Sequence, residues 1–161
     1  MVRLGDAAWL VADRLESMGS HRYRLHWLMP DAHFEWDADE LRLALELSAG
    51  SYHMAFVTSN PAEDCSFARA EDGSARGWRS PSYFLLEPAL SLSLGLRAAS
   101  TWFWTIFSTE RCRTEHRGDA LCLEGQRWSA RISCPKSPEA PRLCASIAFR
   151  TESGESMLIS E

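Results

Sequence analysis

The chain has 161 residues, of which 45% are hydrophobic and 24% charged, and its formal net charge is −5 at pH 7. This length suits one domain with a buried core, and the composition argues against a disordered chain. The negative charge disfavours a protein that holds nucleic acid through overall positive charge, so any anion-binding site must be local.

The five cysteines are an odd number and form no CxxC pair of the type found in zinc ribbons and redox sites. We expect reduced, mostly buried thiols in a cytosolic protein; two disulfides and a spare thiol in an exported protein are the alternative. The start of the chain lacks a signal-peptide pattern, because Asp13 and Arg14 interrupt a short apolar run. No segment is apolar over the roughly 20 residues of a membrane span. These features favour the cytoplasm, although a longer parent protein could be exported.

In chain order, the first predicted element is a strand over residues 7–15. Its apolar groups lie on both faces, so we expect it to be covered on both sides. Residues 21–31 and 40–47 alternate apolar and polar positions and predict strands with one buried face. Extended segments are further expected at 50–57 and 65–70.

The stretch 77–89 has the weakest pattern and predicts a loop. Residues 89–98 alternate leucine with short or polar residues and predict another strand with one buried face. Residues 101–108 are apolar on both faces and predict a core strand. Further strands are expected at 119–124, 127–133, 142–149 and 156–159, and a proline-rich loop at 135–141.

Short strands at spacings of about 10 residues, without a capped helix of three turns, indicate an all-β protein. The predicted fold is an antiparallel β-sandwich of the super-sandwich type with little or no helix, forming one domain over residues 1–161. Because Met1 lies shortly before a strand that should be central, we expect a C-terminal fragment of a longer chain.

Motifs for common chemistries are missing from the sequence. It contains no GxGxxG, GxxxxGKS/T, GxSxG or HExxH. The five histidines are never two or four residues apart, the spacings that would place two ligands on one strand or helix face. We therefore expect no catalytic residue, no metal site and no cofactor.

A row of basic side chains lies on the polar side of the predicted strand 21–31. Side chains two apart on a strand are about 7 Å apart, so Arg22, Arg24 and His26 could contact anionic groups along an acidic glycan. The alternative is a solvent-facing row whose arginines pair with carboxylates of a neighbouring strand. Both interpretations stay open at this point, and the second is favoured.

Two aromatic features also have two interpretations. Arg79 and Tyr83 lie in the predicted loop, where aromatic faces and guanidinium groups often bind sugars and carboxylates; a loop anchored to the core by its aromatics is equally compatible. Trp102 and Trp104 share one strand face and could stack on a sugar, but we favour core positions for both.

Three segments occur in a particular order: WLVADRLESMGSHRYRLHWLMPD (9–31), RGWRSPSYFLLEPALSLSL (76–94) and FWTIFS (103–108). Together they resemble the C-terminal part of heparinase II/III-like proteins, which belong with polysaccharide lyases. The resemblance consists of a strand ending in Asp-Arg-Leu, a turn, a strand with His21 and His26, a Gly-Trp-Arg-Ser-Pro loop, a Tyr and a Pro-Ala-Leu strand.

The resemblance implies a β-sandwich preceded by an α/α-toroid, with β-elimination on uronic-acid glycans at the cleft between them. It implies that catalytic Tyr and His come from the toroid and the early sandwich, which this sequence does not contain. After Tyr83 the family commonly has a Gly and a charged pair, whereas Phe84, Leu85 and Leu86 follow here. This departure predicts a more apolar neighbour for the loop.

The leading functional hypothesis is an accessory sandwich module of such a lyase, inactive alone, whose partner is the missing N-terminal catalytic domain. The alternative is a carbohydrate-binding module for acidic polysaccharide; neither nucleic acid nor a membrane is expected as a partner. Arg22, Arg24, His26, Arg79 and Tyr83 are the candidate glycan or interdomain contacts. A self-contained lyase is disfavoured, because the available tyrosines and histidines show no catalytic spacing.

Overall fold

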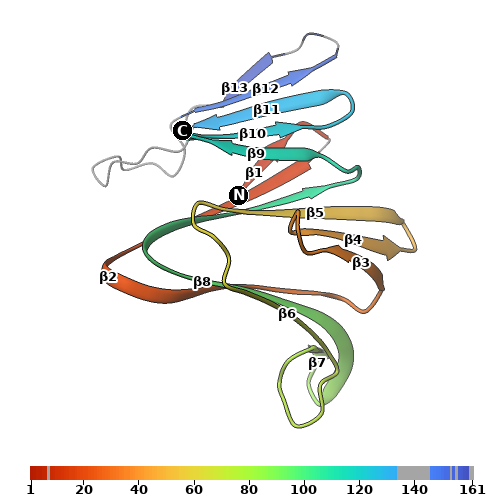
Figure 1. Ribbon diagram of the computed structural model, residues 1–161. Helices are drawn as coiled ribbons and strands as arrows, with labels where there is room; N and C mark the ends of the chain where they lie inside the picture. The colour runs from red at the N-terminus through yellow and green to blue at the C-terminus, as the bar shows by residue number, and fades with distance from the viewer. Residues whose placement is uncertain (7, 134–145, 153, 155, 160–161) are drawn as a thin grey trace. The chain divides into compact units, whose positions relative to one another are not determined.

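The computed structural model describes residues 1–161 except 7, 134–145, 153, 155 and 160–161. The described residues form strands and no helix, which confirms the all-β prediction (Figure 1). The strands are β1 (Val2–Leu4), β2 (Ala8–Pro30), β3 (His33–Asp37), β4 (Arg42–Leu47), β5 (Gly50–Thr58), β6 (Asp64–Arg69), β7 (Trp78–Ser82), β8 (Leu85–Ser108), β9 (Arg113–Arg117), β10 (Ala120–Glu124), β11 (Trp128–Ser133), β12 (Ser146–Thr151) and β13 (Ser156–Ile159).

The chain divides into two compact units. Unit 1 consists of Met1–Arg14, Glu35–Ser59 and Trp102–Glu161, and unit 2 of Leu15–Phe34 and Asn60–Thr101. The two longest strands, β2 and β8, each contribute one part to each unit. The expectation of a single domain over the whole chain stays a prediction.

Unit 1 is a sandwich of two antiparallel sheets. One sheet contains β1, β2, β8, β5, β4 and β3 in that order, and the other runs β13-β12-β11-β10-β9. Inward-facing side chains of both sheets form one buried cluster, as expected for sheets packed face to face. Its members include Leu10, Trp104, Ile106, Leu121, Ile132 and Phe149.

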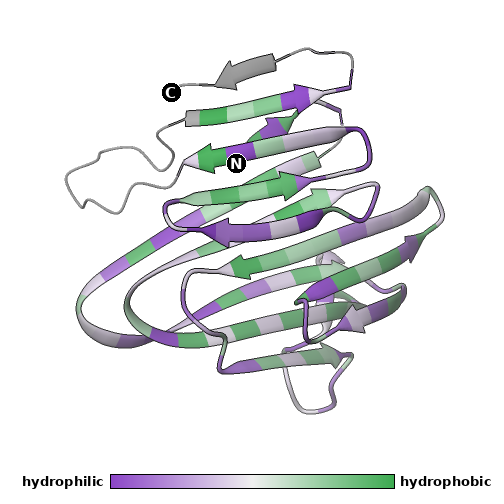
Figure 2. Cartoon of the chain, turned by 45° about the horizontal axis from the view of Figure 1, so that its top comes forward, coloured by the Kyte–Doolittle hydropathy of each residue, from purple (hydrophilic) through white to green (hydrophobic). Residues whose placement is uncertain are grey.

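Unit 2 is built on the first part of β8. β6 pairs with this part along Leu90–Gly95, β7 pairs with its beginning, and the second part of β2 is also its neighbour. Hydrophilic and hydrophobic bands alternate along the long strands in Figure 2. The buried side chains of the apolar face are Leu25, Met29, Leu90, Leu92, Leu94 and Leu96.

Several predicted strands agree with the structure, whereas four observed strands were not predicted from the sequence. The expected strands at 40–47, 50–57, 65–70, 119–124 and 127–133 correspond to β4, β5, β6, β10 and β11 within one or two residues. β1, β3, β7 and β9 were missed because they are short and have few buried side chains. The loop predicted at 135–141 and the beginning of the strand predicted at 142–149 lie outside the described residues.

The turn expected between residues 15 and 21 is wrong, because β2 continues through this segment as one strand. The hydroxyl of Ser17 shares its one proton between the carbonyl oxygens of Gly19, at 2.6 Å, and Ala99, at 3.1 Å, and accepts a hydrogen bond from the hydroxyl of Tyr23. These bonds hold the middle of β2 extended beside β8. No periodic apolar signal marks the segment, since most of its side chains are exposed.

Two burial predictions also need correction. Trp9 is 43% exposed, so the strand at 7–15 is not covered on both sides; the guanidinium of Arg3 lies 5.8 Å from its ring centroid. The strand at 89–98 was expected to bury one face, yet Ser91 and Ser93 are buried as well. These side chains are short, and β8 has neighbouring strands on both edges, so longer side chains of those strands cover them.

Leu121 is fully buried in the core of unit 1, and its replacement by alanine would leave a cavity. We expect Leu121→Ala to lower the free energy of unfolding by about 2–5 kcal/mol, measured by chemical denaturation. Leu28→Ala removes an exposed leucine and should change it by no more than about 0.5 kcal/mol. Equal effects would contradict the assignment of the core.

Candidate functional site

The polar row of β2 lies on the face that the sequence predicted. Leu25 and Met29 are buried and Tyr23 is half-buried, whereas Arg22, Arg24 and His26 are exposed. This alternation confirms that one side of the second part of β2 faces the core of unit 2. We call the side with Arg22, Arg24 and His26 the polar face.

Arg22 is already paired within unit 2. Its Nη2 lies 2.5 Å from Oδ2 of Asp64 on β6, although β8 lies between the two strands. Gly95 of β8 makes this possible, because a Cβ there would lie only 2.6 Å from Asp64 Oδ1. The glycine therefore leaves space for a carboxylate that neutralises Arg22. The pair is about half exposed and contributes little to stability.

His26 also has a partner within the unit. Its Nε2 lies 2.7 Å from the hydroxyl of Ser91 on β8, and Ser91 is fully buried. Arg69 at the end of β6 forms a bidentate ion pair with Asp31: its Nε donates to Oδ1 at 2.5 Å and its Nη2 to Oδ2 at 2.7 Å. This contact lowers the pKa of the Asp31 carboxyl, chiefly through the hydrogen bonds from Arg69. Two of the three side chains that define the polar face, Arg22 and His26, are thus bonded to side chains of β6 and β8.

Arg24 differs from its neighbours on the polar face. Its side chain makes no hydrogen bond or ion pair within the described part of the chain. Its guanidinium group is exposed and retains its capacity to bind a carboxylate or sulfate. Of the three predicted contacts on β2, Arg24 is therefore the one that the fold leaves available.

The loop predicted at 77–89 is instead a β-hairpin formed by β7 and the beginning of β8. Trp78 pairs with Pro88 and Ser82 with Leu85, so Tyr83 and Phe84 form the turn. The pattern failed because Pro81 interrupts β7 and hairpin side chains are mostly exposed. Arg79 is paired with Glu87 of the opposite strand at 2.7 Å, so it is not free for a ligand.

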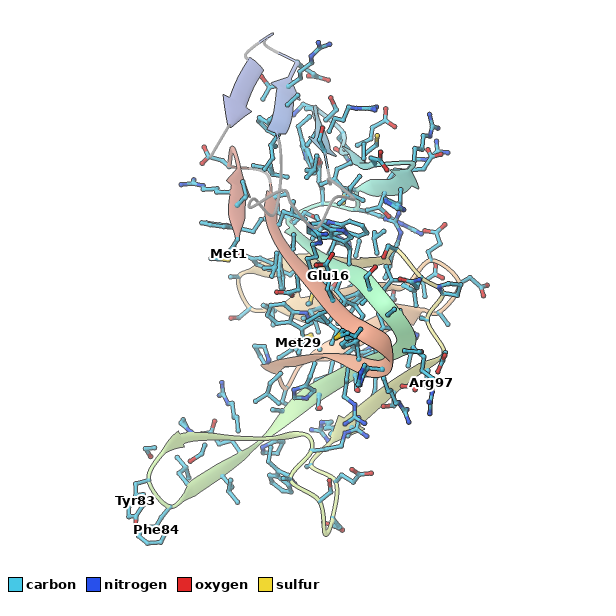
Figure 3. The ribbon with its side chains drawn as sticks, turned by 90° about the vertical axis from the view of Figure 1, so that its left-hand side faces the viewer. Met1, Glu16, Met29, Tyr83, Phe84 and Arg97 are labelled. Carbon is cyan, nitrogen blue, oxygen red and sulfur yellow. The ribbon has the colours of Figure 1, made fainter. Side chains whose placement is uncertain are left out.

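Apolar side chains are concentrated at the end of this hairpin. The hairpin tip, which we define as Tyr83, Phe84, Leu85 and Leu86, is exposed by 88%, 92%, 46% and 66% respectively. The rings of Tyr83 and Phe84 contact each other with centroids 4.1 Å apart and lie at the extremity of the hairpin (Figure 3). The position of Tyr83 there is consistent with a contact residue. Phe84, Leu85 and Leu86 were not among the predicted contact residues, although their sequence predicted a more apolar neighbour for the loop.

The backbone at the tip is strained. Phe84 has a φ of 64°, in the left-handed region that glycine or asparagine normally occupies. For an L-residue with a bulky side chain this conformation costs roughly 1–2 kcal/mol. A glycine would relieve the strain but remove the aromatic side chain.

Other candidate groups do not form a site. Trp102 and Trp104 stack in the core of unit 1 with centroids 5.6 Å apart, which confirms the favoured interpretation. No group of three or more His, Cys, Asp or Glu side chains among the described residues could hold a metal ion. Within the described ranges, no helix is long and apolar enough to span a bilayer.

Three cysteines are described, and each is a free thiol. Cys112 is buried, Cys122 partly buried and Cys65 exposed, so burial of the thiols is only partial; Cys134 and Cys144 lie outside the described residues. Desolvation raises the pKa of Cys112 and of Cys65, and the negative charge of Asp64 raises that of Cys65 further. Neither thiol has the lowered pKa of an activated nucleophile.

Searches with the chain against models of protein families, curated proteins and solved structures found no match.

The raised pKa of Cys65 leads to a prediction about its reactivity. Only the thiolate reacts with iodoacetamide, so Cys65 should be alkylated more slowly than free cysteine at neutral pH. Asp64→Asn removes a negative charge beside the thiol, lowers its pKa and should accelerate the reaction. Mass spectrometry of the peptide containing Cys65 measures the rate, and an unchanged or slower rate in Asp64→Asn would contradict the electrostatic contribution.

Proposed function

We propose that this chain is an accessory β-sandwich module of a heparinase II/III-like polysaccharide lyase, inactive by itself, that docks against the catalytic part of the parent protein. The observation that carries the proposal is the exposed apolar hairpin tip. The all-β antiparallel fold and the order of the three segments that resemble the family are consistent with it.

The chemistry of the hairpin favours docking into an apolar groove. Residues 80–86 carry no charged side chain, and the flanking Arg79 and Glu87 neutralise each other. Apolar side chains held outward at a backbone cost are better explained by burial in a partner than by the stability of the hairpin itself. Four side chains provide only part of the roughly 800 Å² that each partner contributes to a stable complex. A covalently linked domain, with its high effective concentration, is therefore the most suitable partner.

A specific observation also supports a second candidate, binding of acidic polysaccharide on the polar face. Arg24 is exposed and lacks a partner among the described residues, while Arg22 next to it is neutralised by Asp64. A single free guanidinium forms a weak contact, so we rank this candidate below docking.

The docking proposal is tested with the two parts of the parent protein. The coding sequence directly upstream should specify a helical toroid, and this part should co-elute with the chain in size-exclusion chromatography. Phe84→Gly should abolish co-elution and yet leave the chain folded, because glycine relieves the strain at this position. Polyuronate cleavage, followed by ultraviolet absorbance of the unsaturated product, should require the complex.

The matched control is Met18→Ser, which removes an equally exposed apolar side chain elsewhere in unit 2 and should not affect co-elution. Co-elution of Phe84→Gly, or an upstream reading frame without a toroid, would refute docking through the tip. Cleavage of polyuronates by the isolated chain would refute the accessory role.

The second candidate is tested on immobilised heparin with two single variants. If the polar face binds acidic polysaccharide, Arg24→Ala should elute at lower salt than the parent chain, since it removes an available cation. Arg22→Ala removes a guanidinium group that Asp64 already neutralises. Loss of a direct contact between Arg22 and heparin should therefore lower the eluting salt concentration less than loss of Arg24 does. Equal elution of the parent chain and Arg24→Ala would exclude the site.

A further inference from the structure

A pocket with several charged side chains in its lining lies within unit 1, whereas the hairpin tip and the polar face belong to unit 2. Its lining residues come from β3, β4 and β5, which are neighbouring strands in Figure 1, and from the end of β8 with the segment that follows it. The pocket volume is about 240 Å³. At about 30 Å³ per water molecule this is the space of roughly eight waters, enough for a molecule of one ring.

The strand pattern shows which side chains face this pocket. Trp36 packs against Phe56 with ring centroids 6.1 Å apart, on the face opposite to Ala55, which lines the pocket. Alternation along β3 therefore directs Glu35 and Asp37, the neighbours of Trp36, to the pocket face. Trp36 itself is also among the residues that line the pocket.

On β4 and β5, the strand register shows which residues share the pocket face, because directly opposed residues project to the same side of a sheet. Arg42 is opposite Ala55 and Ala44 is opposite His53, while His53 is opposite Ser108 of β8. The side chain of Arg42 also donates a hydrogen bond to the carbonyl oxygen of Cys112. Polar side chains from four segments far apart in the sequence thus meet at one pocket.

The two guanidinium groups of the pocket are neutralised by the protein. Arg42 Nε lies 2.7 Å from Glu40 Oε2, and Arg111 Nη2 lies 2.9 Å from the same oxygen. Arg111 is also 3.6 Å from Asp37 Oδ2. Asp37 and Glu40 thus offset the two guanidinium groups, and Glu35 adds a third carboxylate to the pocket. The site has a negative charge in excess and is a poor receptor for an anion.

The carboxylate of Glu35 is the origin of this excess. It is exposed and makes no hydrogen bond or ion pair with any residue that the structure describes. His53, which also lines the pocket, likewise has no such partner and is half-buried. The pocket therefore offers one free carboxylate to a cation and one imidazole for a further hydrogen bond.

We propose that this pocket binds a small organic cation, a molecule of about one ring that carries a primary ammonium group. The ammonium group pairs with Glu35, and a hydroxyl or carbonyl of the same molecule bonds to the imidazole of His53. This site is independent of the docking proposed for the hairpin tip, and its test uses the isolated chain.

Three sugars of one ring and different charge serve as probes in titration calorimetry. Glucosamine carries an ammonium group, whereas glucose has a hydroxyl at that position and N-acetylglucosamine a neutral amide. We expect glucosamine to bind about twofold to fivefold more tightly than either neutral sugar, the effect of one partly exposed ion pair. Equal binding of all three, or no binding of any, overturns the proposal.

Two variants, one that removes a negative charge and one that removes a positive charge, test whether Glu35 binds the ammonium group. Glu35→Gln should weaken glucosamine binding about twofold to fivefold, and Arg111→Gln should strengthen it, because Asp37 and Glu40 lose a counter-ion. The control is Glu46→Gln on β4, whose carboxylate accepts hydrogen bonds from Ser51 and is not part of the pocket lining. The reverse pattern, with glucuronate bound more tightly than glucosamine, would identify an anion site and overturn the proposal.

Discussion

The structure of both units depends on the burial of β8 on both of its faces. From Ala89 to Leu96 every residue of this strand is buried, and the same is true of Thr101 to Ile106. A strand in this position must satisfy its backbone groups through neighbours on both edges, and β2, β5, β6 and β7 supply them. Apolar side chains alone do not complete this arrangement, because one face of the first part of β8 carries Ser91, Ser93 and Gly95.

These short residues explain the character of the polar face. They keep the surface of β8 low, so that Arg22 of β2 can reach Asp64 of β6 above Gly95, and His26 can bond to Ser91. The resulting ion pair and hydrogen bond cover β8. They also occupy two of the three side chains of the basic row, Arg22 and His26. What resembled an anion-binding row in sequence is thus mainly a set of contacts between strands, with Arg24 as the available member.

The two proposed binding regions differ in the way the fold exposes them. At the hairpin tip, a two-residue turn presents four apolar side chains outside any core. Phe84 places an aromatic side chain there in a strained backbone conformation that glycine would adopt at lower cost. In the pocket of unit 1, strand register and alternation bring charged groups to a concave surface, where Glu40 and Asp37 neutralise two arginines and Glu35 remains unpaired. The first region suits an apolar partner surface and the second a small cation.

The sequence by itself determined the fold class, most of the strands and the inward direction of Leu25, Trp102 and Trp104, because burial of one face leaves a period of two along the chain. It did not reveal the continuity of β2 or the hairpin of β7, because exposed strands lose that period. Only the tertiary structure decided that Arg22 meets Asp64 and that Glu35, His53 and Arg111 line one pocket. These groups are far apart in the sequence, and their proximity arises from strand pairing, which no local pattern encodes.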